Sequence, residues 1–195
     1  MSNLKNTNNK FVAVDNNVPA LSATKQKAGT TYIFYYNQNG EISYLLGADV
    51  SDYAEKIVKV KDSSGQYNPV KGSNSPLTTT TWNDEVGRHE LIPQITEQRR
   101  SKNPISQVRL YYIDSNKYIK ELCLGSDGKW FYGKLTDKNF KAASHSGLYA
   151  AGNADYEKNG GNITVLFMDG DNDNNLTEAT ISVSSGQWEK QVVTN

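Results

Sequence analysis

Three segments of the chain repeat one layout, and this repetition constrains the fold more than any other feature of the sequence. Each segment holds a strand-like run of small residues, an aromatic run, a polar turn, a third run and a Gly-X-aromatic motif that opens a fourth. The motifs are GQY, GKW and GQW, at residues 65–67, 128–130 and 186–188. Four short strands repeated in this way are typical of β-propeller blades. We therefore predict an all-β fold with four antiparallel strands per blade and about three blades in the chain.

The repeats place approximate blades at residues 19–70, 71–140 and 141–195, so residues 19–195 are predicted to form one propeller unit. The first 18 residues are rich in Asn and Lys and are expected to be an N-terminal arm or a closing strand. Three blades do not close a propeller, so the chain needs a partner to cover its sheet edges. The alternative architecture is an irregular β-sandwich, whose hairpins look alike because hairpins generally do.

Charge and composition exclude several classes of protein. The chain has 21 basic and 21 acidic residues, so its charge indicates neither nucleic acid nor an anionic membrane as a partner. It shows no apolar run of signal-peptide or membrane-spanning length, so we expect no membrane insertion and a cytoplasmic location, or secretion by another route. The single cysteine, Cys123, cannot form an internal disulfide and is predicted to be a small core residue.

The most informative segment is VRLYYIDSNKYIKE, at residues 108–121. If residues 114–116 form a three-residue loop, with Asn116 in the left-handed conformation, Arg109 and Glu121 lie directly opposite one another. One interpretation is an ion pair on a wet sheet face, worth about 0–1 kcal/mol. The other is a binding site for a polyol, in which Arg109 and Glu121 together hold adjacent hydroxyls; we call this pair the polar clamp. A guanidinium donates a rigid fork of hydrogen bonds, and a carboxylate accepts from two adjacent hydroxyls.

Aromatic rings at the start of each fourth strand strengthen the second interpretation. Trp130, Trp188 and Tyr67 follow the repeated glycines. Sugars carry apolar C–H faces that settle on such rings. A clamp combined with a repeated aromatic residue indicates carbohydrate binding.

The segments VRLYYIDSNKYIKELCLGSDGKW and SPLTTTTWND resemble the blade signature of the fungal fucose-binding lectins of the Aleuria aurantia type. This resemblance implies a six-bladed propeller that binds fucose in clefts between neighbouring blades, without a metal ion or another cofactor. By the same analogy, two three-bladed chains complete the ring as a homodimer. The expected partners are fucosylated glycans or glycoproteins.

The resemblance also implies the residues of the site. Arg109 and Glu121 of the second unit correspond to the family's polar clamp, and Trp188 of the third unit corresponds to its stacking indole. Three apolar residues of the third unit complete the expected methyl pocket: Ile163, Val165 and Ile181.

The other two units depart from this pattern. In the first unit, Ile33 and Tyr44 are expected at the Arg and Glu positions. In the third unit, Glu178 matches the Glu but Thr164 replaces the Arg, and the first unit of another copy would offer Tyr67 in place of Trp. Glu178, Thr164 and Tyr67 therefore make a possible second, degenerate site. We expect one intact site per chain.

Metal binding and catalysis have less support in the sequence than sugar binding. Residues 169–178, DGDNDNNLTE, have alternating carboxylates like a calcium loop, but they lack its glycine and its distant Glu, so we predict a hairpin turn and no metal. No nucleophile or phosphate-loop motif is present. A glycosidase using Glu121 and Glu178 is opposed by Arg109, which keeps its neighbour charged. We predict no enzyme; the alternative function is a degenerate propeller that acts as a protein-interaction platform without binding sugar.

Overall fold

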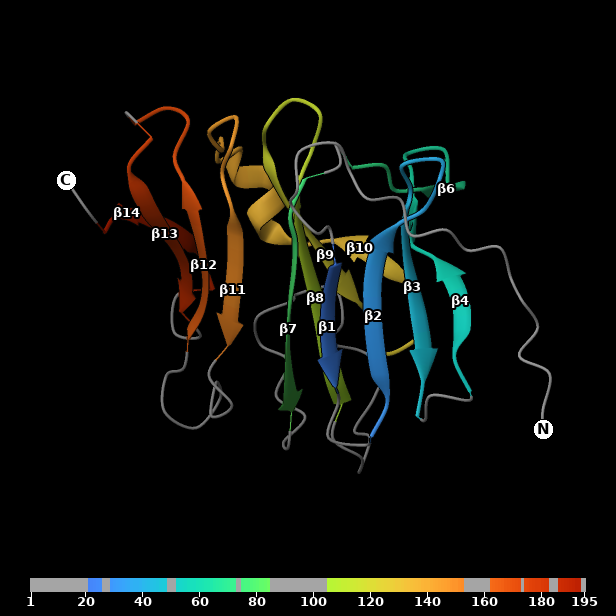
Figure 1. Cartoon of the computed structure of the whole chain (residues 1–195). Helices are drawn as coiled ribbons and strands as arrows, with labels where there is room; N and C mark the ends of the chain where they lie inside the picture. Colours follow the sequence, from blue (N-terminus) through green and yellow to red (C-terminus); the bar gives the residue numbers. More distant parts are fainter. Residues whose placement is uncertain are drawn as a thin grey trace.

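A computed structural model describes residues 21–25, 29–48, 52–72, 75–84, 105–152, 162–172, 174–182 and 186–193. These residues form three β-sheets that stand side by side (Figure 1). The arm expected over residues 1–18 lies outside the described residues. The only helical segment in the described ranges is the 3-10 helix η1, Lys134–Lys138, and no helix there is long and apolar enough to cross a membrane.

The first and third sheets each have four antiparallel strands in simple chain order. The first sheet consists of β1 (Leu21–Lys25), β2 (Thr31–Tyr36), β3 (Ile42–Gly47) and β4 (Ala54–Ile57). The third consists of β11 (Leu148–Gly152), β12 (Asn162–Met168), β13 (Leu176–Ser182) and β14 (Trp188–Val192). This up-and-down order matches the four-strand layout expected for each repeat.

The second sheet has six strands, in the order β6-β5-β10-β9-β8-β7. Its strands are β5 (Lys59–Lys61), β6 (Tyr67–Pro69), β7 (Leu77–Asp84), β8 (Ile105–Ile113), β9 (Ile119–Leu124) and β10 (Trp130–Tyr132). Strand β5 pairs in parallel with β10, through Trp130 and Val60.

The strand that contains Tyr67 is therefore not the fourth strand of the first sheet, and that expectation is wrong. Strand β4 takes this place, and β5 and β6 form a tight hairpin whose turn has Gly65 at φ +90°. The carboxylate of Asp62 stabilises the turn by accepting from the backbone N–H groups of Ser64 and Gln66. Val60 and Val70 anchor the hairpin in the core between the first and second sheets.

The core has two parts, one on each side of the second sheet. Strand β8 supplies both, because its side chains alternate between the two faces. Val108, Leu110 and Tyr112 pack toward the first sheet, whereas Tyr111 and Ile113 pack toward the third. A strand buried on both faces explains why this part of the sequence is nearly continuously apolar and aromatic.

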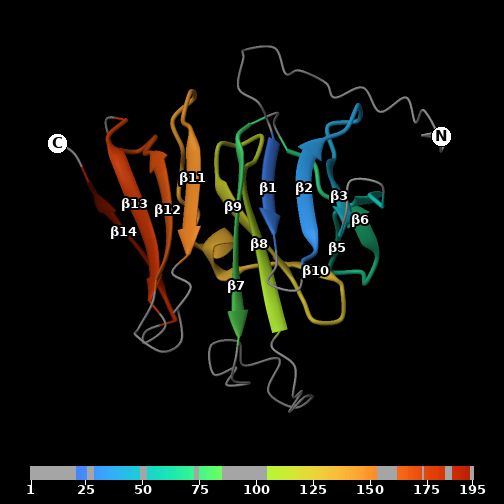
Figure 2. The same cartoon turned by 60° about the horizontal axis from the view of Figure 1, so that its bottom comes forward.

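Strands β1, β7 and β11 lie next to one another where the three sheets meet, as both views show (Figure 1 and Figure 2). The threonines of β7 alternate between the two neighbours. Thr79 shares a hydrogen bond of 2.9 Å with Ser22 of β1, and Thr78 accepts a 3.0 Å bond from the backbone N–H of Ala150 in β11. Small hydroxyl-bearing residues thus let three strands approach closely and still satisfy polar groups.

Candidate functional site

The loop between β8 and β9 has three residues, as expected, but it lies one position later than expected. Lys117 has φ +69° and occupies the left-handed position that was predicted for Asn116. Asp114 pairs with Tyr118 through a backbone bond of 2.9 Å, so the loop covers residues 115–117. The Asp114 side chain explains the shift, because it accepts from the backbone N–H groups of both Asn116 and Tyr118 and so fixes Asp114 in the strand arm.

The later position of the loop changes the cross-strand partners of Arg109 and Glu121, but it leaves both side chains on the same face of the sheet. Arg109 pairs with Cys123, and Glu121 pairs with Tyr111, so the predicted direct opposition of Arg109 and Glu121 is wrong. A one-residue shift of the loop moves every cross-strand partner by two positions, and two positions return a side chain to the same face. Arg109 and Glu121 therefore meet diagonally, with Nη1 of Arg109 donating to Oε1 of Glu121 at 2.5 Å.

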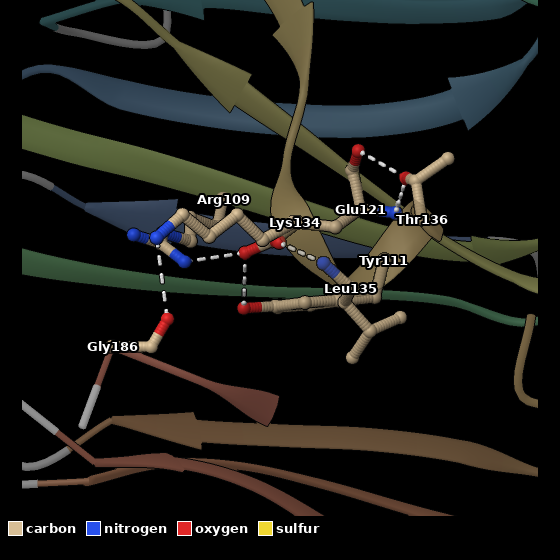
Figure 3. Close-up of polar contacts among 7 residues, drawn as sticks. All are labelled: Arg109, Tyr111, Glu121, Lys134, Leu135, Thr136 and Gly186. Atoms are coloured by element: carbon tan, nitrogen blue, oxygen red, sulfur yellow. Dashed lines mark hydrogen bonds and ion pairs between the residues drawn. The ribbon is translucent and has the colours of Figure 1, made fainter. Parts of the chain in front are cut away.

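Glu121 is held by three hydrogen bonds to its carboxylate (Figure 3). Besides Arg109, the Tyr111 hydroxyl donates to Oε1 at 3.3 Å, and the backbone N–H of Leu135 donates to Oε2 at 3.0 Å. The backbone of Glu121 is bound as well, by the Thr136 hydroxyl and by the N–H of Gly133. The start of η1 thus wraps the glutamate and fixes its orientation.

The ion pair between Arg109 and Glu121 is buried, so it does not lie on a solvent-exposed sheet face. The side chain of Arg109 is 10% exposed and that of Glu121 is 0% exposed. Burial, followed by the negative charge of Glu121, raises the pKa of Tyr111 well above its usual value, and the same two causes raise the pKa of Cys123. Both groups remain neutral, so Tyr111 stays a hydrogen-bond donor to the carboxylate.

The four apolar residues predicted for the site also lie at the interface between the second and third sheets. Ile163, Val165, Ile181 and Trp188 are at most 4% exposed and belong to the same core cluster as Tyr111. The indole of Trp188 packs edge-on against the Tyr111 ring, with centroids 6.2 Å apart. Its buried Nε1 has no hydrogen-bond partner among the described residues. The structure therefore brings all six predicted residues to one interface.

Sequence reasoning missed the residues that support the glutamate. Alternation along β8 places Tyr111 on the face of Arg109, so it was detectable; no sequence signal identified Gly133, Leu135 or Thr136. Lys134 was also missed. Its Nζ donates to the carbonyl oxygen of Gly186 at 3.3 Å and so joins the second sheet to the loop before β14 (Figure 3).

The interface between the first and second sheets repeats this geometry without the ion pair. The β2–β3 turn has Gly40 at φ +69°, hydrogen-bonded as in the β8–β9 turn, which aligns Tyr32 with Arg109 and Tyr44 with Glu121. The predicted match of Ile33 with Arg109 is wrong by one residue.

Aromatic rings take the place of the charges at this first interface. The rings of Tyr32 and Tyr44 lie 5.8 Å apart, and Phe34 meets Trp130 edge-on at 5.7 Å, as Tyr111 meets Trp188. The polar clamp is absent there, as the sequence predicts.

On the open face of the third sheet, Glu178 and Thr164 are in contact, as their positions predict. Glu178 accepts at Oε1 from the hydroxyls of Thr164 (3.2 Å) and Thr180 (3.1 Å), and at Oε2 from Gln191 (3.1 Å). The hydrogen bond from Gln191 is the main cause that lowers the pKa of Glu178. Tyr67, the third residue of the possible second site, lies instead in β6 of the second sheet.

The acidic segment that begins at Asp169 connects β12 to β13 in a hairpin and enters β13 at Leu176, which confirms the predicted turn. Asp169 is buried and accepts a 2.6 Å hydrogen bond from Lys190, so its charge is already paired. No group of three or more His, Cys, Asp or Glu residues in the described ranges is arranged to hold a metal ion.

Comparisons with known proteins agree with this fold. Residues 48–194 match the family model for fungal fucose-specific lectins. The Aleuria aurantia lectin, solved as a six-bladed β-propeller, superposes with a TM-score of 0.63 at 19% identity, covering 94% of this chain and 50% of that one. A fucose lectin from Kordia zhangzhouensis, solved with methyl-fucoside, gives a TM-score of 0.57 at 20% identity, covering 90% of this chain and 99% of that one.

A curated fucose-specific lectin from Arthroderma benhamiae is 27% identical over 78 residues, which are 40% of this chain and 21% of that protein. The chain thus spans about half of the Aleuria lectin and about a fifth of the curated relative. The prediction of an all-β fold built from propeller blades is confirmed. With its family model matched over residues 48–194, the chain belongs to the fungal fucose-specific lectin family.

Proposed function

We propose that this protein is a lectin that binds a fucose-containing glycan, without covalent chemistry, at the interface between its second and third sheets. The observation that carries the proposal is the convergence of an oriented Arg109–Glu121 pair with the indole of Trp188 at one interface between sheets. The buried Nε1 of Trp188 lacks a partner in the described part of the chain, and so does that of Trp130 at the first interface, so the charged pair is what distinguishes the second interface.

Each group has a defined role toward a deoxy-sugar. The Arg109 guanidinium donates to ring and hydroxyl oxygens, and Glu121 accepts from a hydroxyl at the one acceptor position, on Oε2, that its three donors leave. Trp188 contacts the apolar face of the sugar. Ile163, Val165 and Ile181 form an apolar wall of the kind that the methyl group of fucose requires, and all three are buried against the second sheet.

The burial of these groups sets how a ligand reaches them. Arg109, at 8% exposed, is the most accessible of the six residues, and Glu121 is fully enclosed. We expect the sugar to enter past Arg109 and to displace the single 3.3 Å bond that Lys134 makes to Gly186 across the interface. A terminal monosaccharide suits this route better than a residue inside a glycan chain.

We further propose that two chains form a homodimer that completes a six-bladed ring. The chain covers half of the six-bladed Aleuria lectin, and the outer faces of its first and third sheets carry exposed apolar residues. Leu21 on the first sheet is 52% exposed, and Tyr149 on the third is 60% exposed. Light scattering tests this: a mass near twice 21.7 kDa supports the dimer, and a monomer at all concentrations contradicts it.

Titration calorimetry with methyl α-L-fucoside tests the lectin proposal. The variant pair is wild type against Arg109→Met/Glu121→Gln, which removes the clamp while leaving hydrogen-bonding groups for Tyr111 and Leu135. We expect wild-type binding and at least a tenfold loss in the variant. Equal affinities would place the sugar elsewhere.

The second candidate is a propeller that serves as a protein-interaction platform. Two observations favour it: Tyr32 and Tyr44 replace the charged clamp at the first interface, and Thr164 replaces the arginine on the third sheet. A glycan array separates the two candidates. Signal on fucosylated probes supports the lectin, and a blank array together with a co-purifying protein supports the platform.

A further inference from the structure

Lys134 places a cation at the solvent edge of the proposed sugar site. Its backbone lies between Gly133 and Leu135, whose N–H groups bind the backbone carbonyl and the carboxylate of Glu121. Its side chain crosses from η1 to the third sheet, where Nζ donates to the carbonyl oxygen of Gly186 at 3.3 Å (Figure 3). The side chain of Lys134 is exposed, whereas Glu121 is fully enclosed, so Lys134 lies outside the polar clamp.

The protein uses only part of the binding capacity of this ammonium. Lys134 makes no ion pair within the described residues, and the one acceptor that it binds there is the neutral carbonyl of Gly186. An ammonium has three N–H donors, so two remain for a ligand. An anion is a stronger acceptor than a carbonyl, because hydrogen bonds between charged groups are stronger than those with one neutral partner.

The charges around Lys134 on the second sheet leave its positive charge unbalanced. Arg109 and Glu121 form a neutral pair inside the site. Asp137 and Lys138 are the other charged residues of η1, and their charges offset one another. The net charge that this part of the molecule presents at the edge of the site is therefore that of Lys134.

Strand β14, which contacts η1, carries two charged residues close to Trp188, and neither neutralises Lys134. Glu189 follows Trp188, which packs toward the second sheet, so Glu189 points to the opposite, open face of the third sheet. Lys190 returns to the face of Trp188, but its ammonium is bound to the buried carboxylate of Asp169 at 2.6 Å.

We infer that Lys134 selects fucosylated glycans that carry an anionic group, a sulfate ester or a carboxylate, on the sugars next to a terminal fucose. The inference rests on the proposed lectin function and names the class of glycan for the same site. When a terminal fucose occupies the polar clamp, the rest of the glycan stays outside it, beside the exposed side chain of Lys134. The ammonium then exchanges the carbonyl of Gly186 for the anion of the glycan.

The expected preference is modest because the new ion pair forms near solvent. Exposed ion pairs change an equilibrium constant by up to about fivefold. We therefore expect an acidic glycan to bind about two- to fivefold more tightly than its neutral counterpart at low ionic strength. The preference should fall as added salt screens the two charges.

Titration calorimetry at low and high ionic strength tests the inference with three probes that contain the same fucose. The probes are the Lewis x trisaccharide, its 3′-sulfated derivative and its 3′-sialylated derivative, so they also distinguish a sulfate from a carboxylate. Lys134→Met removes the ammonium and keeps the apolar stem, so it should abolish the preference for acidic probes. Lys134→Arg should retain it. Lys138→Met is the matched control, because it removes the same charge from the last turn of η1 and should keep most of the preference. Circular dichroism verifies that each variant is folded.

The outcomes separate this inference from the proposed function. A salt-sensitive preference that is present in wild type and in Lys134→Arg but absent in Lys134→Met supports the inference, and the probe that shows it identifies the anion. Equal or weaker binding of both acidic probes by wild type overturns it, as does a preference that survives in Lys134→Met or is lost equally in Lys138→Met. Binding of methyl α-L-fucoside but of none of the three probes also overturns it and leaves the lectin proposal intact. Absence of any binding by wild type overturns both.

Discussion

Tyr111 lies directly opposite Glu121 across the β8–β9 hairpin, and its hydroxyl donates to the same carboxylate oxygen that Arg109 binds. One oxygen of the glutamate is thus shared by a cation and a phenol, while the other is held by the backbone N–H of Leu135. This arrangement makes the carboxylate rigid before any ligand arrives. Rigid polar groups bind more tightly because less conformational freedom is lost on binding.

The buried ion pair predicts an asymmetric response to mutation. Arg109→Ala leaves the enclosed Glu121 without its cation, and we expect the free energy of unfolding to fall by about 3–5 kcal/mol. Arg109→Met/Glu121→Gln removes both charges and should cost much less, because an apolar or neutral replacement of a buried pair is often close to neutral. Urea denaturation followed by fluorescence measures both. A double variant less stable than Arg109→Ala would contradict this account.

Trp188 and Trp130 occupy equivalent positions in their sheets, so substituting each in turn distinguishes an effect on core packing from an effect on sugar binding. Trp188→Phe and Trp130→Phe each shrink a buried ring in edge-on contact with an aromatic neighbour. We expect each to lower the free energy of unfolding by about 1–3 kcal/mol. Only Trp188→Phe should reduce fucoside affinity, at least tenfold, because Trp130 faces an interface without the clamp. Equal affinity losses in calorimetry would refute the assignment of the site to the second interface.

Gly133 is predicted to be intolerant of a side chain. A Cβ at this position would collide with the carboxylate of Glu121, whereas a Cβ at Gly147 would meet nothing within 4 Å. Gly133→Ala should therefore displace the carboxylate and weaken fucoside binding by at least tenfold, and Gly147→Ala is the matched control with unchanged affinity. Calorimetry measures both variants, and a Gly133→Ala protein with wild-type affinity would disprove the proposed role of the carboxylate.

Cys123 should be inert in the native protein. It is 5% exposed, and burial raises the pKa of its thiol, so little reactive thiolate forms near neutral pH. We expect a thiol reagent to label Cys123 at neutral pH only after denaturant is added, with a rate that follows unfolding. Fast labelling without denaturant would contradict this prediction, because it would show that the sheet opens readily around Cys123.

Alkaline pH should destabilise the fold through its buried tyrosines. Burial is the main cause that raises the pKa of Tyr32 and Tyr44, and it raises the pKa of Tyr36 to about 12. Since these pKa values are higher in the folded than in the unfolded chain, the stabilisation is fully present below about pH 10 and is lost as the pH rises through the folded values. Tyrosinate absorbance should therefore appear together with loss of circular dichroism. Complete ionisation of these tyrosines near pH 10 in a folded protein would contradict this prediction.

Much of the site was predictable from the sequence because side-chain direction in a strand is a local property. The alternation along β8 and β9 puts Arg109 and Glu121 on one face whichever of the two loop positions is used, so the prediction of their contact survived an error in register. The repeated motifs likewise identified Trp188 as the indole of the neighbouring sheet.

Tertiary structure alone decided which strand joins which sheet. The sequence predicts the GQY segment as a fourth strand of the first sheet. Its strand β6 instead pairs with β5, β5 pairs with β10 of the second sheet, and β4 occupies the edge of the first sheet. Sheet pairing joins residues far apart in the chain, so it depends on competing surfaces that no local pattern records. For the same reason the burial of the Arg109–Glu121 pair and the bond from Lys134 to Gly186 emerged only once the three sheets were assembled.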